Sequence, residues 1–91
     1  MNTAQRKVLD GFIAELEDFK EKIEICKNTI EELKDEEQEK YDNMPEGFQN
    51  GEKGETMTSG IDSLENAMSN LDDAITNIES ANEEILSAKG E

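Results

Sequence analysis

The sequence predicts an all-α protein, an antiparallel helical hairpin of the coiled-coil type that dimerises into a four-helix bundle. Three observations carry this prediction. Apolar residues recur in steps of three and four along two segments, and helix-forming Glu and Lys are frequent between them in the first segment. The only Pro and three of the six Gly lie between the two segments. The length of 91 residues suits one small domain, and we expect residues 1–91 to form it.

The first helix is expected over residues 3–41, with Gly11 as its one weak helix former. Its apolar residues occupy the a and d positions of a seven-residue repeat abcdefg, as in helices that pack along a common seam. The single Cys26 is interpreted as one of these core residues rather than as a reactive thiol. The seam residues expected on this helix are Leu9, Phe12, Leu16, Phe19, Ile23, Cys26, Ile30 and Leu33.

The second helix is expected over residues 59–89. Ser59 and Asp62 resemble a capping box at its start, and Gly90 is a plausible stop at its end. Asn82 occupies one a position, where it would help to fix the register. The regular spacing argues against disorder, which 33% hydrophobic and 36% charged residues would otherwise suggest. The apolar seam residues expected here are Ile61, Leu64, Met68, Leu71, Ile75, Ile78 and Ile85.

The connection between the helices is expected over residues 42–58, because Pro45 and Gly47 interrupt a helix. It is longer than most helix–helix connections. Met44, Phe48 and Met57 give it side chains to bury, so we expect an ordered tip. The residues expected at this tip are Tyr41, Asp42, Asn43, Met44, Pro45, Glu46, Gly47 and Phe48.

Two registers of the hairpin fit the pattern. In the first, e positions match in charge and character, and Ile13 faces Leu86. The second is shifted by one repeat; it fills the core layers better but places Ile13 opposite Glu79. The charged pairs of the first register are Lys20 with Glu79, Lys27 with Asp72, and Lys34 with Glu65.

A homodimer is expected because two helices alone leave one side of their apolar seam exposed to solvent. Ordering the backbone costs about 1–2 kcal/mol per residue, which a half-covered seam offsets poorly. Alanines also recur at the g positions of the second helix, where small side chains allow a neighbouring helix to approach closely. The alternative interpretation is that Ala is simply a good helix former. These alanines are Ala67, Ala74, Ala81 and Ala88.

The net charge of −15, from 24 acidic and 9 basic residues, disfavours direct binding to nucleic acid or to an anionic membrane and favours a basic partner. No apolar run approaches the roughly 20 residues that span a bilayer. The N-terminus does not resemble a signal peptide, so a cytoplasmic location is expected, in the host cell if the gene belongs to a phage.

The chain has no His, one Cys and no Gly-rich phosphate loop, which removes the usual catalytic residue sets. We therefore expect no enzyme, no cofactor and no metal. Asp42, Glu46 and Gly47 match three positions of a calcium-binding EF-hand loop, but Met44 and Lys53 stand where two ligands are needed.

An acidic face is predicted on the second helix, because no basic residue occurs between Thr56 and Ala88. A dimer would carry about one net charge per 2 Å of helix, close to the roughly 1.7 Å of duplex DNA. This similarity suggests a nucleic-acid mimic, although acidic faces also serve only to keep helices soluble. The acidic residues are Asp62, Glu65, Asp72, Asp73, Glu79, Glu83 and Glu84.

The stretch from Asp35 to Gln49, with the Gly-Glu-Lys-Gly-Glu that follows, resembles a group of small acidic helical proteins of phages and prophages. Tyr-Asp-Asn-Met-Pro-Glu-Gly is its most specific part, and the resemblance extends to the basic pair Arg6 and Lys7 and to the closing helix. The resemblance implies a mobile-element origin and no mechanism, since the group has no firmly assigned activity. It marks the loop motif as a structured tip or partner-binding site.

These observations lead to two hypotheses of function. The first is a phage-type accessory protein that binds and inhibits a host protein, as an acidic nucleic-acid mimic against a defence or nucleic-acid-processing factor. The alternative is a structural or assembly module of a phage or prophage complex. In the first, the charge binds the partner; in the second, the apolar seam does.

Overall fold

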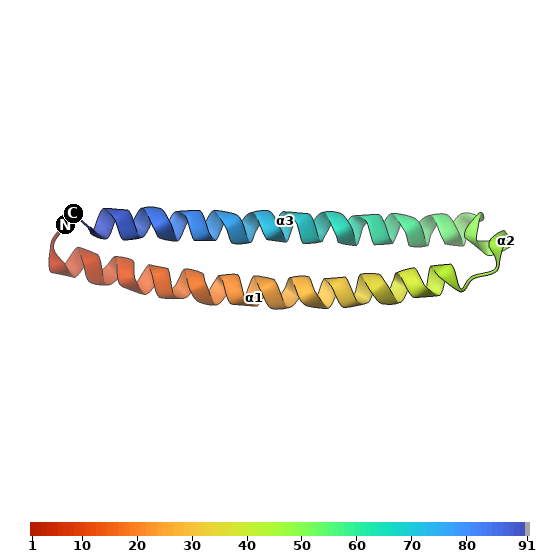
Figure 1. The fold of residues 1–91 in the computed structure, drawn as a ribbon, viewed down its shortest axis with the longest axis horizontal. Helices are drawn as coiled ribbons and strands as arrows, with labels where there is room; N and C mark the ends of the chain where they lie inside the picture. The colour runs from red at the N-terminus through yellow and green to blue at the C-terminus, as the bar shows by residue number, and fades with distance from the viewer. Residues whose placement is uncertain (91) are drawn as a thin grey trace. The chain divides into compact units, whose positions relative to one another are not determined.

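The computed structural model describes residues 1–90 and contains three helices (Figure 1). Helix α1 spans Thr3–Asp42, α2 spans Glu46–Gln49 and α3 spans Glu52–Lys89. No strand occurs in this range, so the prediction of an all-α chain is confirmed. Tertiary contacts divide the chain into two compact units. Unit 1 holds Met1–Ile25 and the chain from Leu71 onward, and unit 2 holds Cys26–Asn70.

Helix α1 begins where it was predicted, because its first turn is capped. The backbone N–H of Asn2 donates to Gln5 Oε1 at 3.0 Å, and the backbone N–H of Gln5 donates to Asn2 Oδ1 at 2.8 Å. This reciprocal pair satisfies two N–H groups in the manner of a capping box, with Asn and Gln in the roles usually taken by Ser or Thr and Glu. The helix ends at Asp42, one residue beyond the predicted Tyr41.

In unit 1 the start of α1 and the end of α3 lie side by side and antiparallel (Figure 1). The guanidinium Nε of Arg6 donates to the Lys89 carbonyl oxygen at 3.0 Å. Further along α1, Lys20 Nζ lies 3.9 Å from Glu79 Oε1. As residue numbers increase along α1, the numbers of the residues that they contact on α3 decrease.

In unit 2 the end of α1, helix α2 and the start of α3 form the turn of the chain. Pro45 precedes α2, and its carbonyl oxygen accepts hydrogen bonds from the N–H groups of Phe48 and Gln49 at 2.9 and 3.1 Å. Gln49 Nε2 donates to the Tyr41 carbonyl oxygen at 2.7 Å, which ties α2 to the last turn of α1. Lys34 Nζ lies 3.5 Å from Glu65 Oε1.

The start of the second long helix was predicted wrongly. Helix α3 begins at Glu52, seven residues before Ser59, so the expected capping box of Ser59 and Asp62 lies inside the helix. Its first turn instead carries acidic residues, which the positive end of the helix dipole stabilises. Gly54 is buried there against the backbone of Gln49, and this packing overrides the weak helix propensity of the Gly- and Thr-rich stretch.

The tip expectation is confirmed in part. A short helix, α2, lies within the predicted connection, and Met44 and Met57 are half-buried. Phe48, however, is 61% exposed rather than buried.

The two long helices use the predicted seam differently. On α3, Ile61 is buried and the other six apolar a and d residues are half-buried, as expected. On α1 the a residues are half-buried but the d residues are exposed, which contradicts the predicted seam. Their place is taken by the e residues, whose lysine stems cover the groove while their ammonium groups reach acids of α3. The exposed d residues are Phe12, Phe19, Cys26 and Leu33.

The ion pairs decide between the two registers. Lys20 with Glu79 in unit 1, and Lys34 with Glu65 in unit 2, both belong to the first register. The shifted register, in which Ile13 would face Glu79, is therefore excluded.

Candidate protein-binding surfaces

The first candidate surface is an apolar stripe on α1 in unit 1, which we define as Val8, Phe12, Phe19 and Ile25. These side chains are 56%, 50%, 52% and 62% exposed. They lie at g, d, d and c positions, the side of α1 that faces solvent once its a and e positions contact α3. Exposed apolar residues gathered on one face, rather than scattered, are typical of sites where another helix or protein binds.

A shallow cavity of about 300 Å³ continues this surface at the start of α1. It is lined by Met1, Gln5, Val8 and Leu9, of which Gln5 alone is polar. A hollow with such a lining can accept an aliphatic or aromatic side chain from a partner, because there is little polar surface to desolvate.

Few charged residues lie beside the apolar stripe. Glu15 and Lys22 occupy the two g positions between its members, and both are exposed. Lys22 Nζ lies 5.8 Å from the centroid of the Phe19 ring, within the range of a cation–π contact. Asp18, at a c position of the same side, is exposed as well, so the stripe carries one uncompensated acid in a chain whose net charge is −15.

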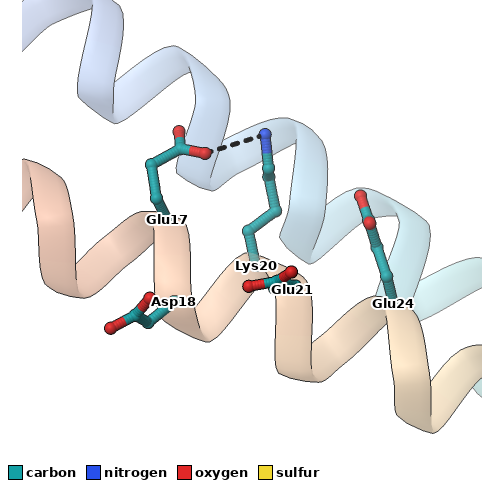
Figure 2. Close-up of a pocket in the computed structure, with 5 residues that line it drawn as sticks. All are labelled: Glu17, Asp18, Lys20, Glu21 and Glu24. Carbon is teal, nitrogen blue, oxygen red and sulfur yellow. Dashed lines mark ion pairs between the residues drawn. The ribbon is translucent and has the colours of Figure 1, made fainter.

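The opposite flank of unit 1 carries ion pairs instead. Lys20 Nζ lies 3.2 Å from Glu17 Oε2 and 3.9 Å from Glu79 Oε1. Figure 2 shows Lys20 and Glu17 joined in this way, with the carboxylate of Asp18 pointing away from them. A second hollow of about 330 Å³ lies here, lined by Glu17, Asp18, Lys20, Glu21 and Glu24. Its single lysine is already held by acids of the same chain.

These contacts shift two titrations. The hydrogen bond from Lys20, followed by that from Asn82, lowers the pKa of Glu17 below its ordinary value of 4.5. The hydrogen bond to Glu17 likewise raises the pKa of Lys20 above 10.5. Both groups are therefore held in their charged forms across the neutral range.

Asn82 is the most deeply placed polar side chain of unit 1. It is 6% exposed, and its Nδ2 donates to Glu17 Oε1 at 3.1 Å. Its Oδ1 is buried without a hydrogen-bond partner among the described residues. A buried acceptor left unpaired costs about 1–3 kcal/mol, so this a position favours register specificity over stability.

The predicted acidic face is the second candidate surface, and the structure divides it. All seven carboxylates are exposed. Glu79 in unit 1 and Glu65 in unit 2 are ion-paired with lysines of α1, so they contribute less to an external partner. Within residues 1–90, Asp62 of unit 2 and Asp73, Glu83 and Glu84 of unit 1 form no such pair.

The remaining predicted residues lie in unit 2. Cys26 is exposed and Leu33 is 51% exposed, so neither is a core residue of its unit. At the predicted tip, Tyr41 and Met44 are half-buried, while Pro45 and Phe48 are exposed. Phe48 is thus the accessible apolar side chain of the turn.

Sequence reasoning missed Val8 and Ile25, because they lie outside the a and d positions on which the seam prediction rested. The signal was present in the pattern. Both are apolar residues at g and c, beside the d residues Phe12 and Phe19, and they widen the apolar side of α1 beyond what one neighbouring helix can cover.

Within residues 1–90, no cluster of three or more His, Cys, Asp or Glu side chains is arranged to hold a metal ion. None of the helices described combines the length and hydropathy that a membrane span requires. No protein-family model matches the chain, and neither a curated protein nor a solved structure is similar to it. Functional inference therefore depends on the surfaces themselves.

Proposed function

We propose that this chain is a non-enzymatic, phage-type accessory protein that binds a basic host protein and blocks its access to nucleic acid. The observation that carries the proposal is the charge separation between the two long helices. Helix α3 has no basic residue from Thr56 to Ala88, and its carboxylates are exposed. Lys20 and Lys34, which reach acids of this stretch, belong to α1.

A basic groove that binds nucleic acid is the partner that fits this surface. Such grooves place Lys and Arg at intervals set by phosphate spacing, and exposed carboxylates at similar density compete for the same residues. A homodimer would double the number of carboxylates on one particle, and we propose that the active form is a homodimeric four-helix bundle. The attraction is electrostatic, so it weakens as salt rises.

The experiment compares two variants of equal net charge. In the first, the four carboxylates of α3 without an ion pair are neutralised: Asp62→Asn, Asp73→Asn, Glu83→Gln and Glu84→Gln. In the control, four exposed acids of α1 are neutralised: Glu21→Gln, Glu31→Gln, Glu32→Gln and Asp35→Asn. Each set raises the net charge from −15 by four units. Proteins captured from host lysate at physiological salt are quantified for the wild type and for both variants.

The proposal expects the wild type and the control to retain a common basic protein that the α3 variant loses, and expects duplex DNA to displace that protein. Equal retention by the two variants would show that position on α3 does not matter. Capture that duplex DNA leaves unchanged would contradict the blocking mechanism.

The second candidate function is a structural module of a larger phage assembly, and the apolar stripe favours it. In that case the stripe, not the charge, contacts the partner. Phe19→Gln would then abolish capture, whereas the four substitutions on α3 would leave capture unchanged.

A further inference from the structure

We propose that the apolar stripe of unit 1 is covered by the same stripe of a second copy, with the two α1 helices antiparallel and a two-fold axis beside Phe19. This inference rests on the proposed function in one respect, the homodimer, and it specifies the face and geometry of that dimer. A second copy is the occupant that the composition, burial and charge of unit 1 favour.

Burial gives the first argument. Among the described residues of unit 1, Asn82 is the only buried one, and it is polar. No apolar side chain of this unit is buried. A unit without an apolar core needs cover from outside, and another copy of the same chain is always present at matching concentration.

Charge gives the second argument. Two chains of net charge −15 repel one another, so they can associate only through a face with few uncompensated acids. The apolar stripe is such a face, because its flanking charges are only two acids, Glu15 and Asp18, and one base, Lys22. In an antiparallel pair with its axis between them, Glu15 of each copy faces Lys22 of the other. The arrangement is self-complementary, as a two-fold interface requires.

The same axis also aligns the apolar residues. Residue numbers that face each other across it add to 37, so Phe12 of one copy lies opposite Ile25 of the other. By the same rule Phe19 lies opposite Asp18 of the other copy, and the two Phe19 rings lie next to each other on either side of the axis. All three apolar side chains are at least half exposed in the single chain, and the pairing covers them together.

Helix α3 permits this approach on the same flank. Lys20 and Glu79 mark the e flank of unit 1, so the g positions of both helices lie on the other side. There α3 presents Ala81, which is exposed and nearly level with Phe19 because Glu17 and Lys20 contact Asn82 and Glu79. A side chain this small lets the α3 helices of two copies approach closely and complete four helices around one core.

The exposed apolar side chains of the stripe offer roughly 300–400 Å² per copy, about half of the 800 Å² of a standard interface. The dimer should therefore dissociate in the micromolar range, where sedimentation equilibrium measures the constant directly.

The first test removes apolar contact. Phe19→Gln lies on the stripe, and Leu86→Gln lies in the same unit at an e position with almost the same exposure, 54% against 52%. Sedimentation equilibrium in 0.15 M salt should show that Phe19→Gln raises the dissociation constant about 100-fold. Leu86→Gln should leave it within about threefold of the wild type.

The second test exchanges charge. Glu15→Lys places lysines opposite each other in its homodimer, and Lys22→Glu places glutamates opposite each other. Each variant alone should dimerise about 10-fold more weakly than the wild type. An equimolar mixture should form a heterodimer of wild-type strength, because every facing pair is then of opposite sign. Circular dichroism of each variant confirms that the helices are retained.

A monomeric wild type at 1 mM would overturn both the homodimer and this face. A wild-type dimer that Phe19→Gln and the charge exchange leave unchanged would overturn the face alone. Equal capture of the basic partner by the α3 variant and its control, with an intact dimer, would contradict only the role of the acidic face, so failures of the two proposals are distinguishable.

Discussion

Helices α1 and α3 carry the same apolar rhythm but use it differently. The two residues that the chain buries most deeply among its larger side chains, Ile61 and Asn82, are both on α3, and no residue of α1 is buried. Helix α3 turns its a, d and most of its g positions inward, whereas α1 turns its a and e positions inward and leaves its d positions exposed. The same spacing therefore yields a covered face on one helix and an uncovered one on the other.

The residues beside the seam explain this difference. The e positions of α1 carry Ile13 and lysines, whose aliphatic stems can lie in the groove, while those of α3 carry three acids and Leu86, all of them exposed. The g positions of α3 are alanines, which fit under a neighbouring helix. A heptad pattern thus predicts how much apolar surface a helix has, while flanking residues decide which part of it meets a given neighbour.

The largest expected effect tests how closely α3 packs compared with α1. A β-carbon built on Gly54 would lie 2.7 Å from the Cα of Gln49 and closer still to its carbonyl oxygen, whereas one built on Gly11 of α1 meets nothing within 4 Å. Gly54→Ala should lower the free energy of unfolding by about 3 kcal/mol. Gly11→Ala should raise it by about 0.5–1 kcal/mol. Urea unfolding followed by circular dichroism measures both.

The second effect compares the two apolar positions of α1 within unit 1. Leu16 is half-buried at an a position, and Phe12 is half exposed at a d position. At concentrations below the dissociation constant of the proposed dimer, Leu16→Ala should cost about 1–3 kcal/mol and Phe12→Ala less than about 0.5 kcal/mol in unfolding free energy. Equal losses at this dilution would mean that α1 does contact α3 through both positions.

The third effect concerns the one polar a position of α3. Asn82→Leu removes a buried acceptor without a partner, so it should raise the free energy of unfolding by about 1 kcal/mol. Asn77→Leu on the same helix is the control, because Asn77 is exposed and should give no comparable gain. A loss of stability in Asn82→Leu would indicate that the hydrogen bond to Glu17 outweighs the unpaired acceptor.

A smaller effect tests the lysines that draw the e positions of α1 inward. Lys34→Glu places a carboxylate beside Glu65 and should cost about 0.5–1 kcal/mol, which the double variant Lys34→Glu/Glu65→Lys should largely restore. The double-mutant cycle is measured by thermal unfolding at low salt. Additive losses would show that the two residues do not interact.

The smallest expected effect is a pH dependence. The pKa of Glu17 is lowered in the folded chain, so its contribution to stability is complete above 4.5 and is lost as the pH falls through the folded value. The pKa of Lys20 is raised, so its contribution is complete below 10.5 and is lost only as the pH rises through its folded value. The stability difference between wild type and Glu17→Gln should be constant from pH 6 to 9 and shrink towards pH 3.

Much of the fold follows from the sequence, because it depends on local and periodic signals. The start of α1 and the interruption at Pro45 were predictable from residue propensity. The pairing of Lys20 with Glu79 and of Lys34 with Glu65 belongs to one of the two registers that the heptad positions left open. The seven extra residues at the start of α3 were not predictable, because their composition is typical of a loop. The close contact of Gly54 with Gln49 is a tertiary contact that local propensity does not reveal.

The candidate surfaces were predictable to different degrees. Exposure of the α3 carboxylates follows from charge and position alone. The exposure of the apolar stripe does not follow from the sequence, because a seam built from a and d positions alone places Phe12 and Phe19 inside the helix pair. These rings lie at the surface because α1 is rotated about its own axis, so that the lysine stems at its e positions face α3. Rotation about a helix axis leaves no trace in the periodicity itself.

Unit 1 carries the ion pairs of Lys20 on one side and the exposed apolar stripe on the other. Dissolved electrolyte acts on them in contrary directions. Added sodium chloride loosens the charged side, while sulfate tightens apolar burial and screens the mutual repulsion of two acidic chains. The ionic composition of the surrounding fluid would thus set how readily copies assemble, with no change in the amount of protein.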